Sequence, residues 1–198
     1  MTSELRQYLE QMDFMAEHTG RPDSFEGYVL REGRPYESAE LSADEMDYLM
    51  RISRRMQFPI KQCYYNSQML MTMRDNDRRL TYVEGYCAHA AIPVLHGWLE
   101  LGGKVVDLTM RTKVPAKRKR FRDRVLGSWS DGRQYWGVRF EREYVVDRMI
   151  ARRAAGSLID DFEGDWPLLR RERPEKPGQI AGFLLRCGCQ NVELKSPA

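Results

Sequence analysis

A chain of 198 residues, 42% hydrophobic and 31% charged, is long enough for one compact domain with its own core, and its composition excludes a largely disordered protein. Its net charge of +3, from 32 basic and 29 acidic residues, is too small for the whole surface to act as a polyanion-binding face. Four cysteines do not suggest a disulfide framework at this length, and neither a secretion signal nor a membrane-spanning apolar run is present, so we expect one cytoplasmic domain with free thiols.

The N-terminal part of this domain, residues 1–58, is predicted to be mainly helical. Apolar residues recur at three- and four-residue intervals over residues 3–17, which is the spacing of an amphipathic helix. Glycine and proline then interrupt the pattern, and residues 21–40 are expected to be loop-like. Ser42 and Glu45 have the spacing of a capping box, so a second helix is predicted to begin here.

The central part, residues 59–140, is expected to hold one helix and an antiparallel sheet. Cys63 stands directly before a helical pattern that runs to residue 75. Strand-like patterns follow over residues 80–87, 92–101, 104–108 and 134–140. Gly102 and Gly103 are a strong hairpin signal between the second and third of these strands. Helices followed by an antiparallel sheet make the expected fold class α+β.

The C-terminal part, residues 141–198, is expected to be helical and irregular. Residues 141–155 are predicted to form a helix. The side chains expected to face inward on this helix are Val145, Val146, Met149 and Ile150. Residues 157–169 mix large apolar side chains with acids and are expected to form a packed, irregular arm. Cys187 and Cys189 form a single CxC pair, which is a weak metal signal, so we expect free thiols and no metal site.

Strand counting across the two-glycine turn brings two polar residues together. If the glycines are the two turn residues, Leu101 faces Lys104 across the hairpin. His96 and Asp107 are then diagonal neighbours on one face of the sheet, about 7 Å apart between Cα atoms. The sequence therefore predicts a histidine and a carboxylate within side-chain reach of each other.

Cys63, His96 and Asp107 together supply the groups that thiol-based acyl transfer requires: a nucleophile, a general base and a carboxylate that orients the base. A position at a helix start favours a thiolate and can hold a developing oxyanion. Each residue also has a simpler interpretation, as a core thiol, a core histidine or a turn cap, but their joint placement favours chemistry. The accompanying candidates are Gln57 and Gln62 as oxyanion donors, and Tyr64, Asn66 and Trp98 as pocket residues.

The order of Cys63, Tyr82-Val-Glu-Gly-Tyr86, His96-Gly-Trp98 and Val106-Asp107-Leu-Thr109 resembles the transglutaminase-like superfamily of papain-like cysteine enzymes. In that pattern a helix-starting cysteine is followed by a strand ending in V-x-G-Y, a His-Ala-Trp strand and an Asp-Pro-Thr strand end. The resemblance implies a cysteine helix packed on an antiparallel sheet that carries the histidine and the aspartate. It also implies cleavage or transfer of an acyl group at an amide bond, by a protease, amidase or deamidase that uses no cofactor.

The chain departs from that pattern at flanking positions. Gly97 stands where alanine is usual and Leu108 where proline is usual, and Lys61 and Gln62 replace small residues before Cys63. None of these changes removes a catalytic atom, but flanking residues shape the cleft. The substrate, a peptide or another amide-bearing molecule, therefore stays open, as does the choice between hydrolysis and transfer. The remaining chain, including the SLIDDFEGDWPLL stretch, resembles sequences of phage or bacterial origin.

The basic stretch over residues 111–124 is the second candidate feature. Its central basic residues are Lys117, Arg118, Lys119, Arg120 and Arg122. The default interpretation is a solvated loop, and the alternative is a contact with nucleic acid or another polyanion. A non-catalytic protein of the same fold, binding nucleic acid or an acidic partner through this stretch, therefore remains the alternative function. No membrane contact is expected, and the sequence does not determine the oligomeric state.

Overall fold

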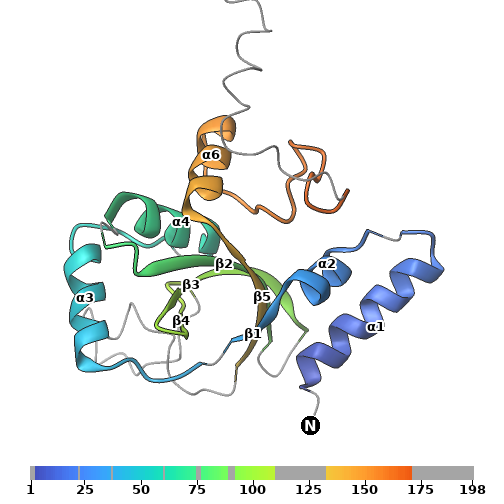
Figure 1. Cartoon of the computed structure of the whole chain (residues 1–198), viewed down its shortest axis with the longest axis horizontal. Helices are drawn as coiled ribbons and strands as arrows, with labels where there is room; N and C mark the ends of the chain where they lie inside the picture. Colours follow the sequence, from blue (N-terminus) through green and yellow to red (C-terminus); the bar gives the residue numbers. More distant parts are fainter. Residues whose placement is uncertain are drawn as a thin grey trace, which may run out of the picture.

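The computed structural model describes residues 3–21, 23–36, 38–59, 61–74, 77–88, 92–109 and 133–170. These residues form a mixed α+β structure with helices packed around a curled, antiparallel sheet (Figure 1). The expected α+β class is confirmed at this level. The basic stretch at 111–124 and the pair Cys187 and Cys189 lie outside the described residues.

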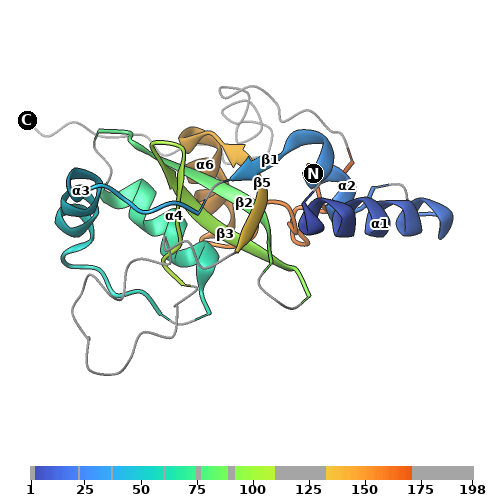
Figure 2. The same ribbon diagram turned by 90° about the horizontal axis from the view of Figure 1, so that it is seen from below.

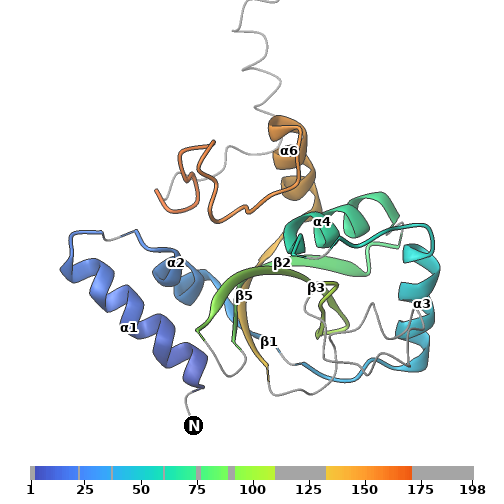
Figure 3. The same cartoon turned by 180° about the vertical axis from the view of Figure 1, so that it is seen from behind.

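The described helices are α1 (Glu4–His18), α2 (Phe25–Glu32), α3 (Ala43–Ser53), α4 (Cys63–Arg74) and α6 (Arg142–Arg152). The described strands are β1 (Arg34–Tyr36), β2 (Leu80–Ala88), β3 (Val94–Leu101), β4 (Lys104–Val106) and β5 (Gln134–Phe140). Helices α1 and α2 lie towards one end of the sheet and α3 towards the other (Figures 1 and 3). Seen from below, α1 extends from the sheet in the direction away from α3 (Figure 2).

Helix caps explain where the N-terminal helices begin. The predicted capping box is confirmed, because the Ser42 hydroxyl accepts from Glu45 N at 3.2 Å and the Glu45 carboxylate accepts from Ser42 N at 2.7 Å. The prediction of a loop over residues 21–40 is wrong, since α2 and β1 lie within this range. The Ser24 side chain caps α2 by accepting from Gly27 N at 2.8 Å. A serine cap without a glutamate three residues later is a weaker signal than a capping box.

The sheet has the order β1-β5-β2-β3-β4, and all neighbouring strands run antiparallel. The predicted hairpin register is confirmed, because Leu101 pairs with Lys104 across the turn. Gly102 and Gly103 have φ of 60° and 84°, the left-handed values that a two-residue hairpin turn of this kind requires. The β3–β4 ladder ends at the pair of Leu99 and Val106, so β3 before Leu99 has no β4 partner.

Two glycines meet at the centre of the curled sheet. Gly85 of β2 pairs with Gly137 of β5 on one side and with His96 of β3 on the other. A Cβ on Gly85 would lie 2.2 Å from Trp136 O and 2.4 Å from Gly137 Cα. The two strands therefore approach each other at a place where no side chain fits, as is typical of sharply bent sheets.

The two faces of the sheet bury different clusters. The larger cluster joins one face to side chains of α1, α2, α3, α4 and α6, with Leu9, Leu49, Leu70 and Tyr82 among its fully buried members. The opposite face carries a smaller cluster of buried residues: Tyr36, Val83, Cys87, Trp98, Val105 and Tyr135. His96 alternates with Gly97 along β3 and therefore shares the face of Trp98.

A buried carboxylate on β2 anchors the C-terminal arm, residues 153–170. Glu84 accepts hydrogen bonds from Leu158 N at 2.8 Å, Ile159 N at 3.1 Å and the hydroxyls of Tyr82 and Ser157. Burial raises the pKa of Glu84 even though these donors oppose the shift. The expectation of a packed, irregular arm is confirmed for Leu158 and Ile159, which are buried.

Helix α6 ends earlier than predicted, and one of the side chains expected to face inward is exposed. Its last residue is Arg152, and Arg153 adopts a left-handed conformation that closes it. Val145 is fully buried as expected, but Ile150 is 69% exposed, so the prediction that it faces inward is wrong. The two residues lie five positions apart, which places them on different faces of a helix.

Candidate active site

Cys63 is the first residue of α4 and is partly exposed. Lys61, two residues earlier, has a left-handed φ of 64°, which turns the chain into the helix. The first turn of α4 contains no acidic residue, so no carboxylate of that turn neutralises the positive end of the helix dipole. The sulfur therefore lies beside the backbone amides of the first helical turn, which have no partner within the helix.

His96 and Asp107 form a buried pair, as strand counting predicted. The Nε2 atom of His96 lies 2.7 Å from Oδ2 of Asp107, and the two side chains are 5% and 0% exposed. A carboxylate can only accept, so Nε2 carries the hydrogen in this bond. The other ring nitrogen, Nδ1, is then the atom left for the sulfur.

Cys63 interacts with the same ring. Burial by itself lowers the pKa of His96, but the charge and hydrogen bond of Asp107, with the hydrogen bond and charge of Cys63, outweigh it and raise the pKa from 6.5 to about 10. His96 is therefore an imidazolium at neutral pH, with a carboxylate on one side and sulfur on the other. The three residues that the sequence singled out are brought together.

Two further donors hold the carboxylate of Asp107. Thr109 N donates to Oδ1 at 2.8 Å, and the Tyr135 hydroxyl donates to Oδ2 at 3.0 Å. Burial raises the pKa of Tyr135 well above its usual value, so the phenol keeps its proton and can donate at neutral pH. Sequence reasoning missed Tyr135, because a tyrosine in a predicted strand gives no sign of which carboxylate it will reach.

Two neighbouring side chains of α4, both fully buried, join the cysteine helix to the hairpin. Asn66 Nδ2 donates to Thr109 Oγ1 and to Pro59 O, each at 2.9 Å. Ser67 Oγ donates to Gly97 O at 3.3 Å. Asn66 was expected to line a pocket; it is instead buried at the junction of three segments. Sequence reasoning missed Ser67.

The other predicted residues lie around this centre in different ways. Trp98 is fully buried beside His96, with the two ring centroids 6.3 Å apart and the rings stacked, so it supports the histidine and lines no open pocket. Tyr64 packs against Gly97, where an added Cβ would lie 2.9 Å from its ring. Gln57 and Gln62 are both exposed, and Gln62 O accepts from Asn66 N at 2.9 Å.

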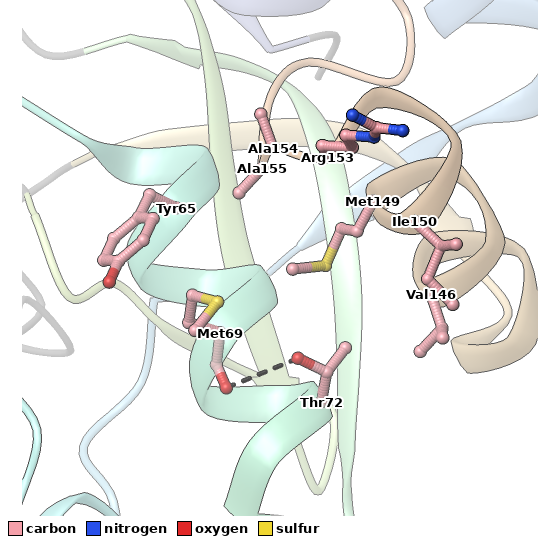
Figure 4. A pocket seen from close by; sticks show the side chains of 9 residues that line it. All are labelled: Tyr65, Met69, Thr72, Val146, Met149, Ile150, Arg153, Ala154 and Ala155. Atoms are coloured by element: carbon pink, nitrogen blue, oxygen red, sulfur yellow. Dashed lines mark hydrogen bonds between the residues drawn. The ribbon is translucent and has the colours of Figure 1, made fainter.

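An apolar groove of about 380 Å³ lies between α4 and α6 (Figure 4). Its lining residues are Tyr65, Met69, Thr72, Val146, Met149, Ile150, Arg153, Ala154 and Ala155. A helix turns about 100° per residue, so the α4 residues of the groove lie roughly 180° to 240° around the helix from Cys63. The groove is therefore on the far side of α4 from the thiol and does not extend the Cys63 site.

Within the described part of the chain, no group of three or more histidine, cysteine or acidic residues is arranged to hold a metal ion. None of the described helices has the length and apolar composition needed to cross a membrane.

Comparisons with protein-family models, with curated proteins and with solved structures find no match for this chain. The assignment of a function therefore depends on the geometry of Cys63, His96 and Asp107.

Proposed function

We propose that this protein is a transglutaminase-like cysteine enzyme that cleaves or transfers an acyl group at an amide bond. One observation carries the proposal: a histidine bonded through Nε2 to a buried carboxylate, at 2.7 Å, also interacts with the cysteine that starts a helix. A nucleophile, a base and an orienting group in this relation are the signature of nucleophilic catalysis. A papain-like arrangement, with the cysteine helix against a sheet that carries the other two residues, fits the same contacts.

The reaction follows from the position of the His96 imidazolium between Asp107 and the Cys63 sulfur. The Cys63 thiolate attacks the carbonyl carbon of the amide, and the carbonyl electron pair moves to oxygen. As the C–N bond breaks, His96 gives its Nδ1 proton to the departing amine, which leaves a thioester on Cys63. Water or an acceptor amine then attacks the thioester, returns a proton to His96 and releases the thiolate. Asp107 keeps the imidazole oriented through both steps.

The developing oxyanion needs donors near the sulfur. The backbone amide of Cys63 is the natural first donor, because amides in the first turn of a helix have no partner within the helix. Gln57 and Gln62 remain candidates for a second donor, and their exposed side chains leave them free to move towards a bound substrate. These oxyanion donors do not determine whether the substrate is a peptide or another amide.

Thiol labelling tests the proposal without a known substrate. We expect iodoacetamide at neutral pH to modify Cys63 at least about tenfold faster than Cys87, which is buried, and faster than a free thiol such as glutathione. His96→Ala is expected to slow the labelling of Cys63 by a similar factor, and Asp107→Asn to slow it less. Peptide mass spectrometry reports each thiol separately.

Trapping of the acyl-enzyme tests the second half of the proposal. A panel of activated amides and esters is expected to leave a mass increase on Cys63 that hydroxylamine removes, as a thioester requires. Cys63→Ala is the matched control and should show no adduct. Labelling of Cys63 at the rate of a free thiol, with no change in His96→Ala, would sink the proposed triad.

A further inference from the structure

The cysteine helix reaches the triad at a place where the sheet lacks a strand. The β3–β4 ladder stops at Leu99 and Val106, so no β4 residue pairs with Gly97. The α4 helix contacts this part of β3, and Ser67 Oγ donates to Gly97 O there. Gly97 directly follows His96 in the chain, so this contact ties α4 to the arm that carries the base.

The neighbouring residue ties α4 to the other arm. Asn66 Nδ2 donates to Thr109 Oγ1, and the Thr109 backbone amide donates to Oδ1 of Asp107. The same Asn66 amide group donates to Pro59 O, in the segment that leads into α4. A single side chain therefore links the entry to the nucleophile helix, the helix itself and the turn that holds the orienting carboxylate.

The need to hold α4 against the hairpin does not by itself explain why Asn66 and Ser67 are polar. Asn66 and Ser67 are fully buried, and Asn66 Oδ1 has no hydrogen-bond partner within the described part of the chain. Burying an amide is costly unless its groups are paired, whereas an apolar side chain would hold the helix without that cost. Hydrogen bonds differ from apolar contacts in fixing distance and direction. The hydrogen bonds of Asn66 and Ser67 end at residues next to Asp107 and His96, so they can fix the distance and direction between α4 and these two side chains.

We propose that Asn66, Ser67 and Thr109 form a positioning latch that sets Cys63 against the His96–Asp107 pair. The inference rests on the proposed function for its chemical consequence. None of the three residues touches the reacting atoms; they act by holding α4 in register with both arms of the hairpin. Loss of the latch lets the helix start shift relative to the ring, and displacement on the order of 1 Å is enough to slow catalysis strongly.

The sharpest test changes the hydroxyl of Thr109. Thr109→Val keeps the shape of the side chain and the backbone amide that donates to Asp107, but it removes one of the two acceptors of Asn66 Nδ2 and leaves only Pro59 O. Thr109→Ser restores that acceptor. We expect Thr109→Val to slow iodoacetamide labelling of Cys63 by at least about threefold, and Thr109→Ser to remain within about twofold of the wild type.

Gln68 provides the matched control. It is also a buried amide of α4, but its side chain bonds to the backbone of Gly156 in the C-terminal arm and to Tyr82, and to neither arm of the hairpin. Gln68→Met should lower the melting temperature without changing the labelling rate of Cys63. A loss of labelling in Gln68→Met equal to that in Thr109→Val would mean that general loosening of α4, and not the latch, sets the rate, and would overturn the proposal.

A spectroscopic measurement separates failure of the latch from failure of the proposed function. The chain has three histidines, so isotope-labelled histidine gives few ring signals, and His96→Gln assigns the one bonded to Asp107. The latch predicts that Thr109→Val shifts this Nε2 proton signal or speeds its exchange with water, and that Thr109→Ser does not. An unchanged signal together with an unchanged labelling rate would refute the latch. If wild-type Cys63 proves unreactive, the proposed function fails. The Nε2 proton signal of His96 in Thr109→Val then tests the latch without the labelling rate.

Discussion

His96 couples the stability of the protein to its proposed chemistry at the scale of a single residue. Its pKa is raised to about 10 in the folded protein, against 6.5 for an ordinary histidine. The folded state therefore binds this proton more tightly than the unfolded chain does. The stabilisation is fully present below about pH 6.5 and is lost as the pH rises towards about 10.

Melting at several pH values measures this link. We expect the wild type to lose stability between pH 7 and pH 10 by on the order of a few kcal/mol more than His96→Gln does. Glutamine can still donate to Asp107 but does not titrate, so the difference between the two curves reports the His96 proton together with its coupling to Cys63. The variant should be less stable at neutral pH, because the buried carboxylate has lost its cation. Parallel curves would contradict an imidazolium in the folded state.

Among the elements, the hairpin of β3 and β4 could be predicted because its register depends on local sequence. Two turn glycines set the pairing of Leu101 with Lys104, and counting then places His96 and Asp107 on one face. The cap of α3 could be predicted for the same reason, because Ser42 and Glu45 lie three residues apart. Local patterns say nothing about contacts between distant segments. The bond from Asn66 to Thr109 spans 43 positions in sequence, and that from Tyr135 to Asp107 spans 28.

The attachment of the C-terminal arm to β2 depends on an acceptor that only a carboxylate supplies. Both oxygens of Glu84 accept, and the four donors come from Tyr82 and from residues 157–159. Glutamine at this position would turn an NH₂ group towards two of those donors. We expect Glu84→Gln to cost about 2–4 kcal/mol of unfolding free energy and to speed hydrogen exchange at Leu158 and Ile159.

Glu100 serves as the comparison for that experiment. Its carboxylate pairs with Arg34 and Arg139, whose side chains are 53% and 50% exposed. The Glu100 side chain is itself only 9% exposed, but both arginines stay hydrated when Glu100 is neutralised, so Glu100→Gln should cost less than Glu84→Gln, on the order of 1 kcal/mol, and leave exchange in the arm unchanged. Equal effects of the two substitutions would argue against a special role for Glu84 in holding the arm.

At the scale of the whole molecule, the curl of the sheet completes the site. β5 and β4 are separated in the sheet by β2 and β3, which in a flat sheet amounts to roughly 14 Å between them. The Tyr135 hydroxyl of β5 nevertheless reaches Asp107, just after β4, at 3.0 Å. Side chains on the concave face of a curved sheet converge, and the close approach at Gly85 and Gly137 permits that curvature.

Gly85→Ala is therefore expected to damage the fold and the site together. Its Cβ would meet backbone atoms of Trp136 and Gly137, which cannot move aside as a flexible side chain could. We expect a loss of about 2–3 kcal/mol in denaturant unfolding and slower labelling of Cys63, because flattening the sheet draws Tyr135 away from Asp107. Gly156→Ala is the control, since its Cβ would meet only Arg152 Nη1, at an ordinary 3.5 Å. If Gly85→Ala unfolds like Gly156→Ala and labels at the wild-type rate, the close approach of β2 and β5 is not what shapes the site.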